Sequence, residues 1–161
     1  MKSLKTTDGR TDMEHKIAIK NIGSPVSYEN TSLKYRCDLK KVIGCENIPE
    51  MVEISNGLFL LADEEGRMKK LKHNFFAFMP HHSTQFQTII GNAVFARFKP
   101  VNSLTEIYDY ELDDLTQQDV DFINCLLVEE LQNILKERFI KRYKDVDNPV
   151  GYWGFTVSTF D

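Results

Sequence analysis

Alternation of apolar and polar residues runs through much of the chain and predicts β-strands. Residues 15–22 (HKIAIKNI) alternate with the period of two that is typical of a half-buried strand. Residues 88–98 (TIIGNAVFARF) form the clearest strand, within which Gly91 and Asn92 suggest a bulge or a close backbone approach. Residues 105–112 alternate apolar residues with acids, and we expect them to pair beside this strand.

Turn-forming residues divide the middle of the chain into hairpins. Asn56-Gly57 tolerates the positive φ angles of a two-residue hairpin turn, and Glu65-Gly66 can form a similar turn after an acidic tip. The strands of this meander are expected at residues 51–54, 58–62, 67–71 and 75–79. The polar residues 80–87 (PHHSTQFQ) are expected to form a long loop, and residues 23–32 (GSPVSYENTS) a turn.

Two helices are predicted by the spacing of apolar residues and by signals at the helix ends. A short helix over residues 33–43 is expected to end at Gly44. A long helix over residues 117–143 begins with a capping box, in which Thr116 accepts from the backbone of Asp119 and the Asp119 side chain reaches back. Its first turn is acidic and its end is basic, which complements the helix dipole. Its apolar face consists of Val120, Ile123, Leu127, Leu131, Ile134 and Leu135.

Together these elements predict an α+β fold. An antiparallel β-sheet of five or six strands packs against one long C-terminal amphipathic helix, with a short helix nearer the N-terminus. Residues 15–144 are expected to form one domain, and the polar residues 1–14 a disordered extension in which Met13 is a second candidate start. Residues 145–161 form an aromatic C-terminal tail, which has to dock on the sheet, under the helix or on another subunit as a homodimer.

Composition and charge exclude several classes of function. The 161 residues are 42% apolar and 27% charged, an ordinary globular mixture, and their formal net charge of −4 gives no general attraction to nucleic acid. No segment approaches the ~20 apolar residues of a membrane helix, and the N-terminus lacks the apolar core of a signal peptide. The three cysteines have no close partner in sequence and are expected to be thiols in a reducing compartment. We therefore expect a cytoplasmic protein that does not bind a membrane.

Known catalytic and cofactor-binding motifs are missing from the sequence. It contains no glycine-rich phosphate loop, nucleophile elbow or dinucleotide fingerprint. The spacing of its histidines does not match a metal site, so no catalytic residue, cofactor or metal is predicted. One alternative is a binding site for a small ligand or a nucleotide, with or without a metal, formed around the polar loop by Asn74, His81, His82 and Asn92.

Charged segments suggest two kinds of interaction surface. An acidic segment before the long helix could meet a basic partner protein, although a solvated edge or a magnesium site would use the same residues. With the aromatic residues of the tail it forms the predicted partner surface: Glu106, Asp109, Glu111, Asp113, Asp114, Tyr152, Trp153 and Phe155. The basic end of the long helix could bind nucleic acid through Arg138, Lys141 and Arg142, but complementation of the helix dipole explains these charges without a ligand.

Three segments also resemble a known protein family. Residues 56–74 (NGLFLLADEEGRMKKLKHN), 88–98 and 114–123 (DLTQQDVDFI) follow the order found in a small family of unknown function from phages, plasmids and other mobile elements of Gram-positive bacteria. The match covers roughly residues 33–128 and rests on structural motifs. The chain departs from the family pattern in lacking a proline near Asn74 and in its longer helix and tail. The resemblance implies a mobile-element protein in a bacterial cytoplasm and supplies no catalytic residues.

The expected function is that of a non-enzymatic phage or mobile-element protein. It would bind and inhibit a host bacterial protein, such as a CRISPR effector or a restriction system, through the acidic segment and the aromatic tail. Small-ligand binding and nucleic-acid binding are the alternatives from other classes of function. The negative net charge disfavours nucleic acid.

Overall fold

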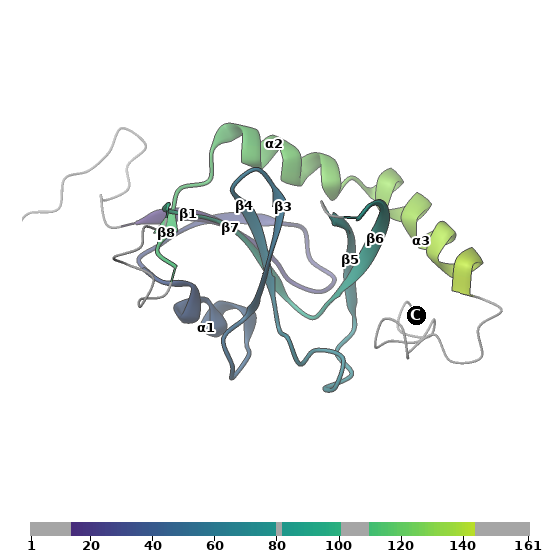
Figure 1. Cartoon of the computed structure of the whole chain (residues 1–161), viewed down its shortest axis with the longest axis horizontal. Helices are drawn as coiled ribbons and strands as arrows, with labels where there is room; N and C mark the ends of the chain where they lie inside the picture. Colours follow the sequence, from purple (N-terminus) through teal and green to yellow (C-terminus); the bar gives the residue numbers. More distant parts are fainter. Residues whose placement is uncertain (1–13, 80–81, 101–109, 144–161) are drawn as a thin grey trace, which may run out of the picture.

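The computed structural model of the chain describes residues 14–79, 82–100 and 110–143, and it shows an α+β fold in which antiparallel sheet packs against helices (Figure 1). The strands are β1 (His15–Lys20), β2 (Ser27–Thr31), β3 (Glu50–Ser55), β4 (Leu58–Ala62), β5 (His73–Met79), β6 (His82–Ile90), β7 (Ala93–Phe98) and β8 (Leu112–Asp113). The helical segments are the 3-10 turn η1 (Arg36–Leu39) and the helices α1 (Lys40–Ile43), α2 (Gln117–Leu126) and α3 (Glu129–Tyr143). The predicted fold class is confirmed.

Strand β7 lies at the centre of the main sheet. It pairs with β1 on one side and β4 on the other, which gives a six-stranded sheet of order β2-β1-β7-β4-β3, and β8 pairs with the end of β7. Strands β5 and β6 form a separate two-stranded sheet. Every pair is antiparallel, as predicted, and the β3–β4 hairpin turns at Asn56-Gly57, where Gly57 has the positive φ of 77° that a tight turn uses.

Both faces of the six-stranded sheet are buried, and the alternation along β7 divides its residues between them. Ala93 and Phe95 pack in a cluster with residues of β5, β6 and α2, whereas Val94 and Ala96 pack in a second cluster with residues of η1 and α1. A third cluster joins the β5–β6 sheet to α3 through Phe76, Ile90, Leu135 and Phe139. The two-stranded sheet is therefore held between the main sheet and α3.

The structure contains two helices where one long helix was predicted over residues 117–143. α2 ends at Leu126 and α3 begins at Glu129, so the direction of the chain changes between them (Figure 1). The physical reason is that the two helices pack in different apolar clusters: Ile123 of α2 lies in the cluster between the main sheet and β5–β6, and Phe139 of α3 lies in the cluster with Phe76 and Ile90 of β5–β6. The carboxamide of Gln132 stabilises the break, because its Nε2 donates to the last carbonyl of α2 at 2.8 Å.

The predicted capping box at the start of α2 is confirmed. The backbone N–H of Asp119 donates to Thr116 Oγ1 at 3.1 Å, and the backbone N–H of Thr116 donates to Asp119 Oδ2 at 2.8 Å. Arg97 of β7 adds a two-point contact, with Nε and Nη2 each 2.8 Å from a different carboxylate oxygen of Asp119. Burial alone raises the pKa of the Asp119 carboxyl, but the hydrogen bonds from Arg97 and Thr116 outweigh it, and the pKa lies below its usual value.

Two predictions in the middle of the chain were wrong. Residues 67–71 form turns in place of a strand, because local hydrogen bonds such as Leu71 N–H to Gly66 O at 3.0 Å satisfy the backbone there. Residues 82–87, predicted as loop, belong to β6. They pair with the end of β5, where Ala77 lies opposite Gln87 and Phe78 opposite Phe86. A polar strand is possible at this position because β6 pairs with β5 alone.

Other element boundaries also differ from prediction. The single strand expected over residues 88–98 is divided at Gly91, whose φ of 81° turns the chain from the second sheet into the main sheet. Residues 27–31, predicted as turn, form β2 because they pair along β1. The short helix covers residues 36–43 and ends at Gly44 with a φ of 86°, as the sequence indicated.

Candidate functional site

A pocket of about 340 Å³ opens between the two sheets. One wall consists of Glu50 and Val52 from β3 with Leu60 and Ala62 from β4. Because alternate residues of a strand share a face, these four side chains all project from the same side of the main sheet. The opposite wall is formed by residues 87–90 of β6, and the loop after β4 closes one end. The pocket is thus a part of the space between the sheets that side chains do not fill.

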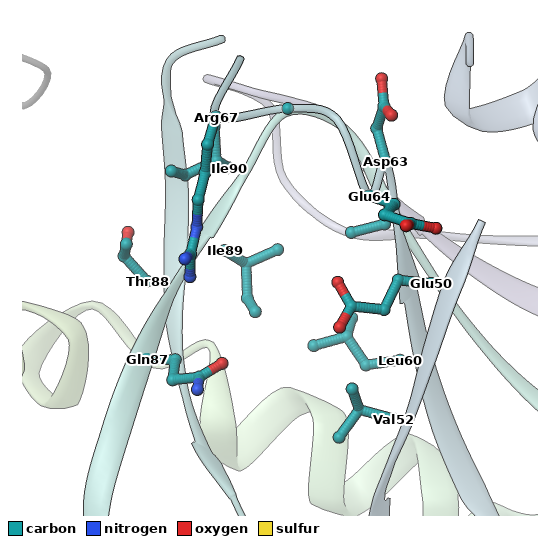
Figure 2. Close-up of a pocket in the computed structure, with 12 residues that line it drawn as sticks. Glu50, Val52, Leu60, Asp63, Glu64, Arg67, Gln87, Thr88, Ile89 and Ile90 are labelled. Carbon is teal, nitrogen blue, oxygen red and sulfur yellow. The ribbon is translucent and has the colours of Figure 1, made fainter. Parts of the chain in front are cut away.

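Two polar side chains point into this pocket from opposite walls. Figure 2 shows the carboxylate of Glu50 entering from the β3 side and the carboxamide of Gln87 entering from the β6 side. Val52, Leu60 and Ile89 line the space between them with apolar surface (Figure 2). Within the described residues, neither Glu50 nor Gln87 makes a side-chain hydrogen bond or an ion pair. Both groups are therefore available to a bound molecule.

The rim of the pocket carries three further charged residues. Asp63 accepts from Lys69 Nζ at 2.8 Å and from the backbone N–H of Glu65 at 2.9 Å, so its charge is neutralised within the loop. The hydrogen bond to Asp63 raises the pKa of the Lys69 ammonium. Figure 2 shows Asp63 and Glu64 directed away from the cavity, and Arg67 lying along the β6 side. The remaining charged residues that line the pocket are Glu50, Glu64 and Arg67.

Behind the pocket, buried Thr88 pairs with the partly buried His73. Thr88 is only 4% exposed, and its hydroxyl shares a hydrogen bond with Nδ1 of His73 on β5. The Thr88 side chain points away from the cavity (Figure 2), so this hydroxyl does not face a ligand. Burial, followed by the positive charges of Lys136 and Lys20, lowers the pKa of His73 to about 4. His73 is therefore neutral near pH 7 and serves the packing between β5 and β6.

The residues of the predicted ligand site are not brought together around this pocket. Asn74 Nδ2 donates to the backbone oxygens of Lys20 at 2.7 Å and Gly91 at 2.8 Å, which joins β5 to the end of β1. Asn92 Oδ1 accepts from the backbone N–H of Ile22 at 3.0 Å. Both asparagines thus have structural partners. His81 and the side chain of His82 lie outside the described residues.

Most acids of the predicted partner surface that the structure describes have partners within the chain. The Glu111 carboxylate lies 3.7 Å from Lys34 Nζ and 3.6 Å from Lys99 Nζ. Asp114 Oδ1 accepts from the backbone N–H of Lys16 at 3.0 Å, which attaches the start of β1 to the segment before α2. Glu106 and Asp109 lie outside the described residues, as do Tyr152, Trp153 and Phe155 of the tail. The partner surface stays a prediction.

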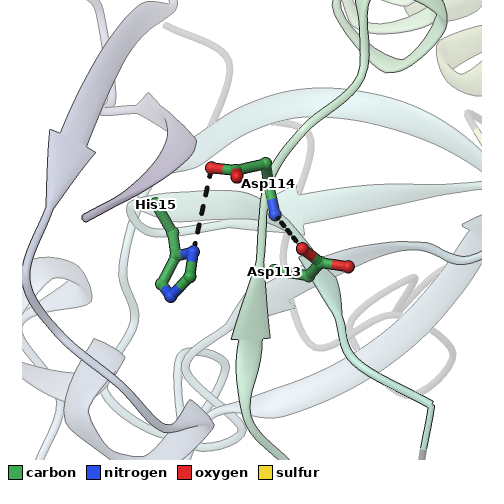
Figure 3. Close-up of side chains that lie close together, drawn as sticks. All are labelled: His15, Asp113 and Asp114. Atoms are coloured by element: carbon green, nitrogen blue, oxygen red, sulfur yellow. Dashed lines mark hydrogen bonds and ion pairs between the residues drawn. The ribbon is translucent and has the colours of Figure 1, made fainter. Parts of the chain in front are cut away.

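Asp113 and Asp114 meet His15 to form a group that could hold a metal ion. One ligand atom from each of the three lies within 4.8 Å of the others (Figure 3). His15 Nδ1 is 3.8 Å from Asp114 Oδ1, and within the described chain it has no hydrogen-bond partner although it is buried. Asp113 Oδ1 accepts from the backbone N–H of Asp114 at 2.8 Å, so this oxygen of the carboxylate already has a hydrogen-bond donor. Nitrogen and oxygen ligands of this kind suit a divalent transition metal.

The alternative nucleic-acid surface is exposed but narrow. Arg138, Lys141 and Arg142 are exposed on α3, at the C-terminal end where positive charge complements the helix dipole. Phe139, between them in sequence, is 1% exposed and packs against β5–β6, so it is not available to stack on a base.

Comparison with known proteins adds no family assignment. Set against family models, curated proteins and solved structures, the chain shows no significant match to any of the three. The resemblance to the mobile-element family therefore stays a prediction. Of the helices in the described parts of the chain, none combines the length and the apolar character that crossing a bilayer requires.

Sequence analysis missed the pocket residues Glu50 and Gln87. The alternation of Glu50 with Val52 placed both on one face of a strand, and this was the available signal. Gln87 gave no such signal, because residues 80–87 were interpreted as loop. The meeting of the two walls depends on how the sheets pack, which local pattern does not determine.

Proposed function

We propose that the protein binds a small molecule in the pocket between β3–β4 and β6, and that it binds there without catalysing a reaction. The observation that carries this proposal is the convergence of Glu50 and Gln87, from two different sheets, on a space of about 340 Å³. Small-molecule sites typically enclose ~300–1,000 Å³ of mostly apolar surface with a few placed polar groups. The volume of this pocket lies at the lower end of that range, and its lining exposes more polar than apolar surface.

The chemistry of the lining supports binding over catalysis. The groups that point into the pocket are one carboxylate, one carboxamide and apolar side chains. The hydroxyl of Thr88 is directed to His73 on the far side of β6, away from a bound molecule. Paired acid and base groups on a reacting atom are what general acid–base catalysis requires, and a single carboxylate does not supply them.

A ligand screen on the whole chain tests this function. Small amines, dipeptides, dicarboxylic acids and nucleotides are added at millimolar concentration, and the midpoint of thermal unfolding is measured. A ligand present at 100 times its Kd stabilises the folded state by about 2.7 kcal/mol, which raises the midpoint by several degrees. We expect Glu50→Gln or Gln87→Leu to remove the shift, and Glu137→Gln, on the exposed face of α3, to leave it unchanged. The function would be refuted if no compound shifts the midpoint, or if the shift is the same in the wild type and in both pocket variants.

A second candidate function, inhibition of a host protein, is favoured by exposed apolar residues on the helices. Phe122 of α2 is 39% exposed, Val128 at the helix break 41% and Ile134 of α3 46%. Large exposed apolar side chains are typical of the centre of a protein interface. They add to the predicted acidic and aromatic surface and support binding to another protein, whereas the choice of a bacterial defence factor as partner rests on the resemblance to the mobile-element family alone.

Affinity purification tests the second function. The tagged chain is isolated from a bacterial host after nuclease treatment and a high-salt wash, and bound proteins are identified by mass spectrometry. One stoichiometric host protein that is lost with Phe122→Ser and kept with Asn124→Ser would support the inhibitor. Recovery of the chain alone would contradict it.

A further inference from the structure

We propose that the ligand of the pocket carries a primary ammonium group on an apolar body. This inference rests on the proposed ligand-binding function and names the chemical class of the ligand. It is argued from the charge of the lining, from the direction of Glu50, and from the apolar surface beside that carboxylate.

The charge on the β3 wall favours a cationic group. Of the three carboxylates in the lining, Asp63 is neutralised by Lys69 at 2.8 Å, and Glu64 is directed away from the cavity (Figure 2). Glu50 is therefore the carboxylate that a ligand on this wall would meet, while the guanidinium of Arg67 lies along the β6 side. A phosphate or carboxylate group beside Glu50 would be repelled, whereas a cation would be attracted.

The direction of Glu50 selects a donor group. Its carboxylate is the one acidic group that points into the cavity in Figure 2, and it can only accept hydrogen bonds. An ammonium group supplies up to three donors as well as the opposite charge, and such charge-assisted hydrogen bonds are stronger than neutral ones. Gln87, on the facing wall, can donate to or accept from a neutral polar group on the same ligand.

Three apolar side chains near Glu50 favour a ligand with an apolar part. Val52 and Leu60 flank the carboxylate on its own wall, and Ile89 faces it from β6. A bare polyamine would leave this surface unused, whereas an amine attached to a branched aliphatic chain would bury it at roughly 25 cal/mol per Å². Both a free aliphatic amine and the N-terminus of a peptide have this chemistry.

Two matched probes test the ammonium group by titration calorimetry with the whole chain. Leucyl-leucinamide carries the ammonium, and N-acetyl-leucyl-leucinamide differs mainly in lacking it. We expect acetylation to weaken binding by about tenfold or more, as the loss of a charged hydrogen bond does. We also expect Glu50→Gln to weaken the first probe and leave the second unchanged, while Glu137→Gln affects neither. Glu50 is exposed on an edge strand, so this variant should keep the wild-type unfolding midpoint.

The outcomes separate the ligand class from the function itself. Equal binding of both probes, or tighter binding of a nucleotide or dicarboxylic acid that depends on Gln87, would overturn the ammonium assignment and leave the pocket function standing. No binding of any compound in the screen would overturn both. Hexylamine distinguishes the two sources of the group: binding as tight as that of leucyl-leucinamide assigns a free amine, and much weaker binding assigns a peptide N-terminus.

Discussion

Gln132 should contribute more to the stability of this fold than any exposed residue of α3, because its carboxamide joins three elements. Its Nε2 donates to the backbone oxygens of Phe76 at 3.0 Å and Leu126 at 2.8 Å, and its Oε1 accepts from the backbone N–H of Phe76 at 2.8 Å. Both backbone groups of one β5 residue and the last carbonyl of α2 therefore depend on one side chain of α3. The perturbation is Gln132→Met, which keeps the length of the side chain and removes all three hydrogen bonds.

The expected loss follows from that count. A hydrogen bond contributes about 0.5–1.5 kcal/mol net, and a polar group left unpaired in a buried position costs about 1–3 kcal/mol. Because Gln132 is only partly buried, water can replace some of the lost bonds. Three bonds at ~1 kcal/mol each predict a loss of about 3 kcal/mol, a large share of the ~5–15 kcal/mol that stabilises a typical domain.

Urea unfolding followed by circular dichroism measures this loss. Asn133→Ala is the control, because it removes an exposed amide one residue further along the same helix and should change stability by less than about 0.5 kcal/mol. If Gln132→Met costs no more than the control, the carboxamide does not hold the helix break, and the reasoning is wrong.

Three further predictions concern buried charge and backbone geometry. The pKa of His73 is about 4 in the folded chain and 6.5 when the group is unperturbed. At a pH between these two values the unfolded chain therefore binds a proton that the folded chain does not. Stability should therefore fall by up to about 3 kcal/mol as the pH drops through this window, and urea titrations of His73→Gln should lack that component. Asp119→Ala removes the capping box and the carboxylate partner of Arg97, which keeps only its hydrogen bond to the backbone oxygen of Asn56; thermal unfolding should show a loss of about 3 kcal/mol, and a loss under 1 kcal/mol would contradict the structure. Gly91→Ala should cost more than Gly44→Ala, since both have positive φ but only at Gly91 would the added Cβ lie 2.8 Å from a leucine methyl carbon; equal unfolding free energies would refute this.

Local signals in the sequence predicted the elements whose causes lie within a few residues. The capping box at Thr116, the hairpin at Asn56-Gly57 and the helix end at Gly44 are all present, because turn and cap geometry depends on neighbouring residues alone. Helical spacing also placed Ile123 and Leu135 on a buried face, but Ile134, predicted on the same face, is 46% exposed. The spacing did not locate the break after Leu126, because Ile123 and Leu135 fit one helical stripe although they pack in different apolar clusters.

The candidate site depended on contacts that no local pattern contains. Glu50 and Gln87 come from strands of different sheets, and only the packing of those sheets places them across one pocket. His15 meets the acids before α2 for a similar reason, since the Lys16–Asp114 hydrogen bond beside it spans 98 positions of the chain.

By itself, the sequence determined the α+β class, the antiparallel strands and the ends of several elements, because alternation, turns and caps act over short distances. The tertiary structure decided that β7 is central, that the chain passes at Gly91 from β6 in the second sheet to β7 in the main sheet, and that α3 turns away from α2. These choices follow from the burial of apolar faces against one another, a property of the whole chain. The pocket is one result of them.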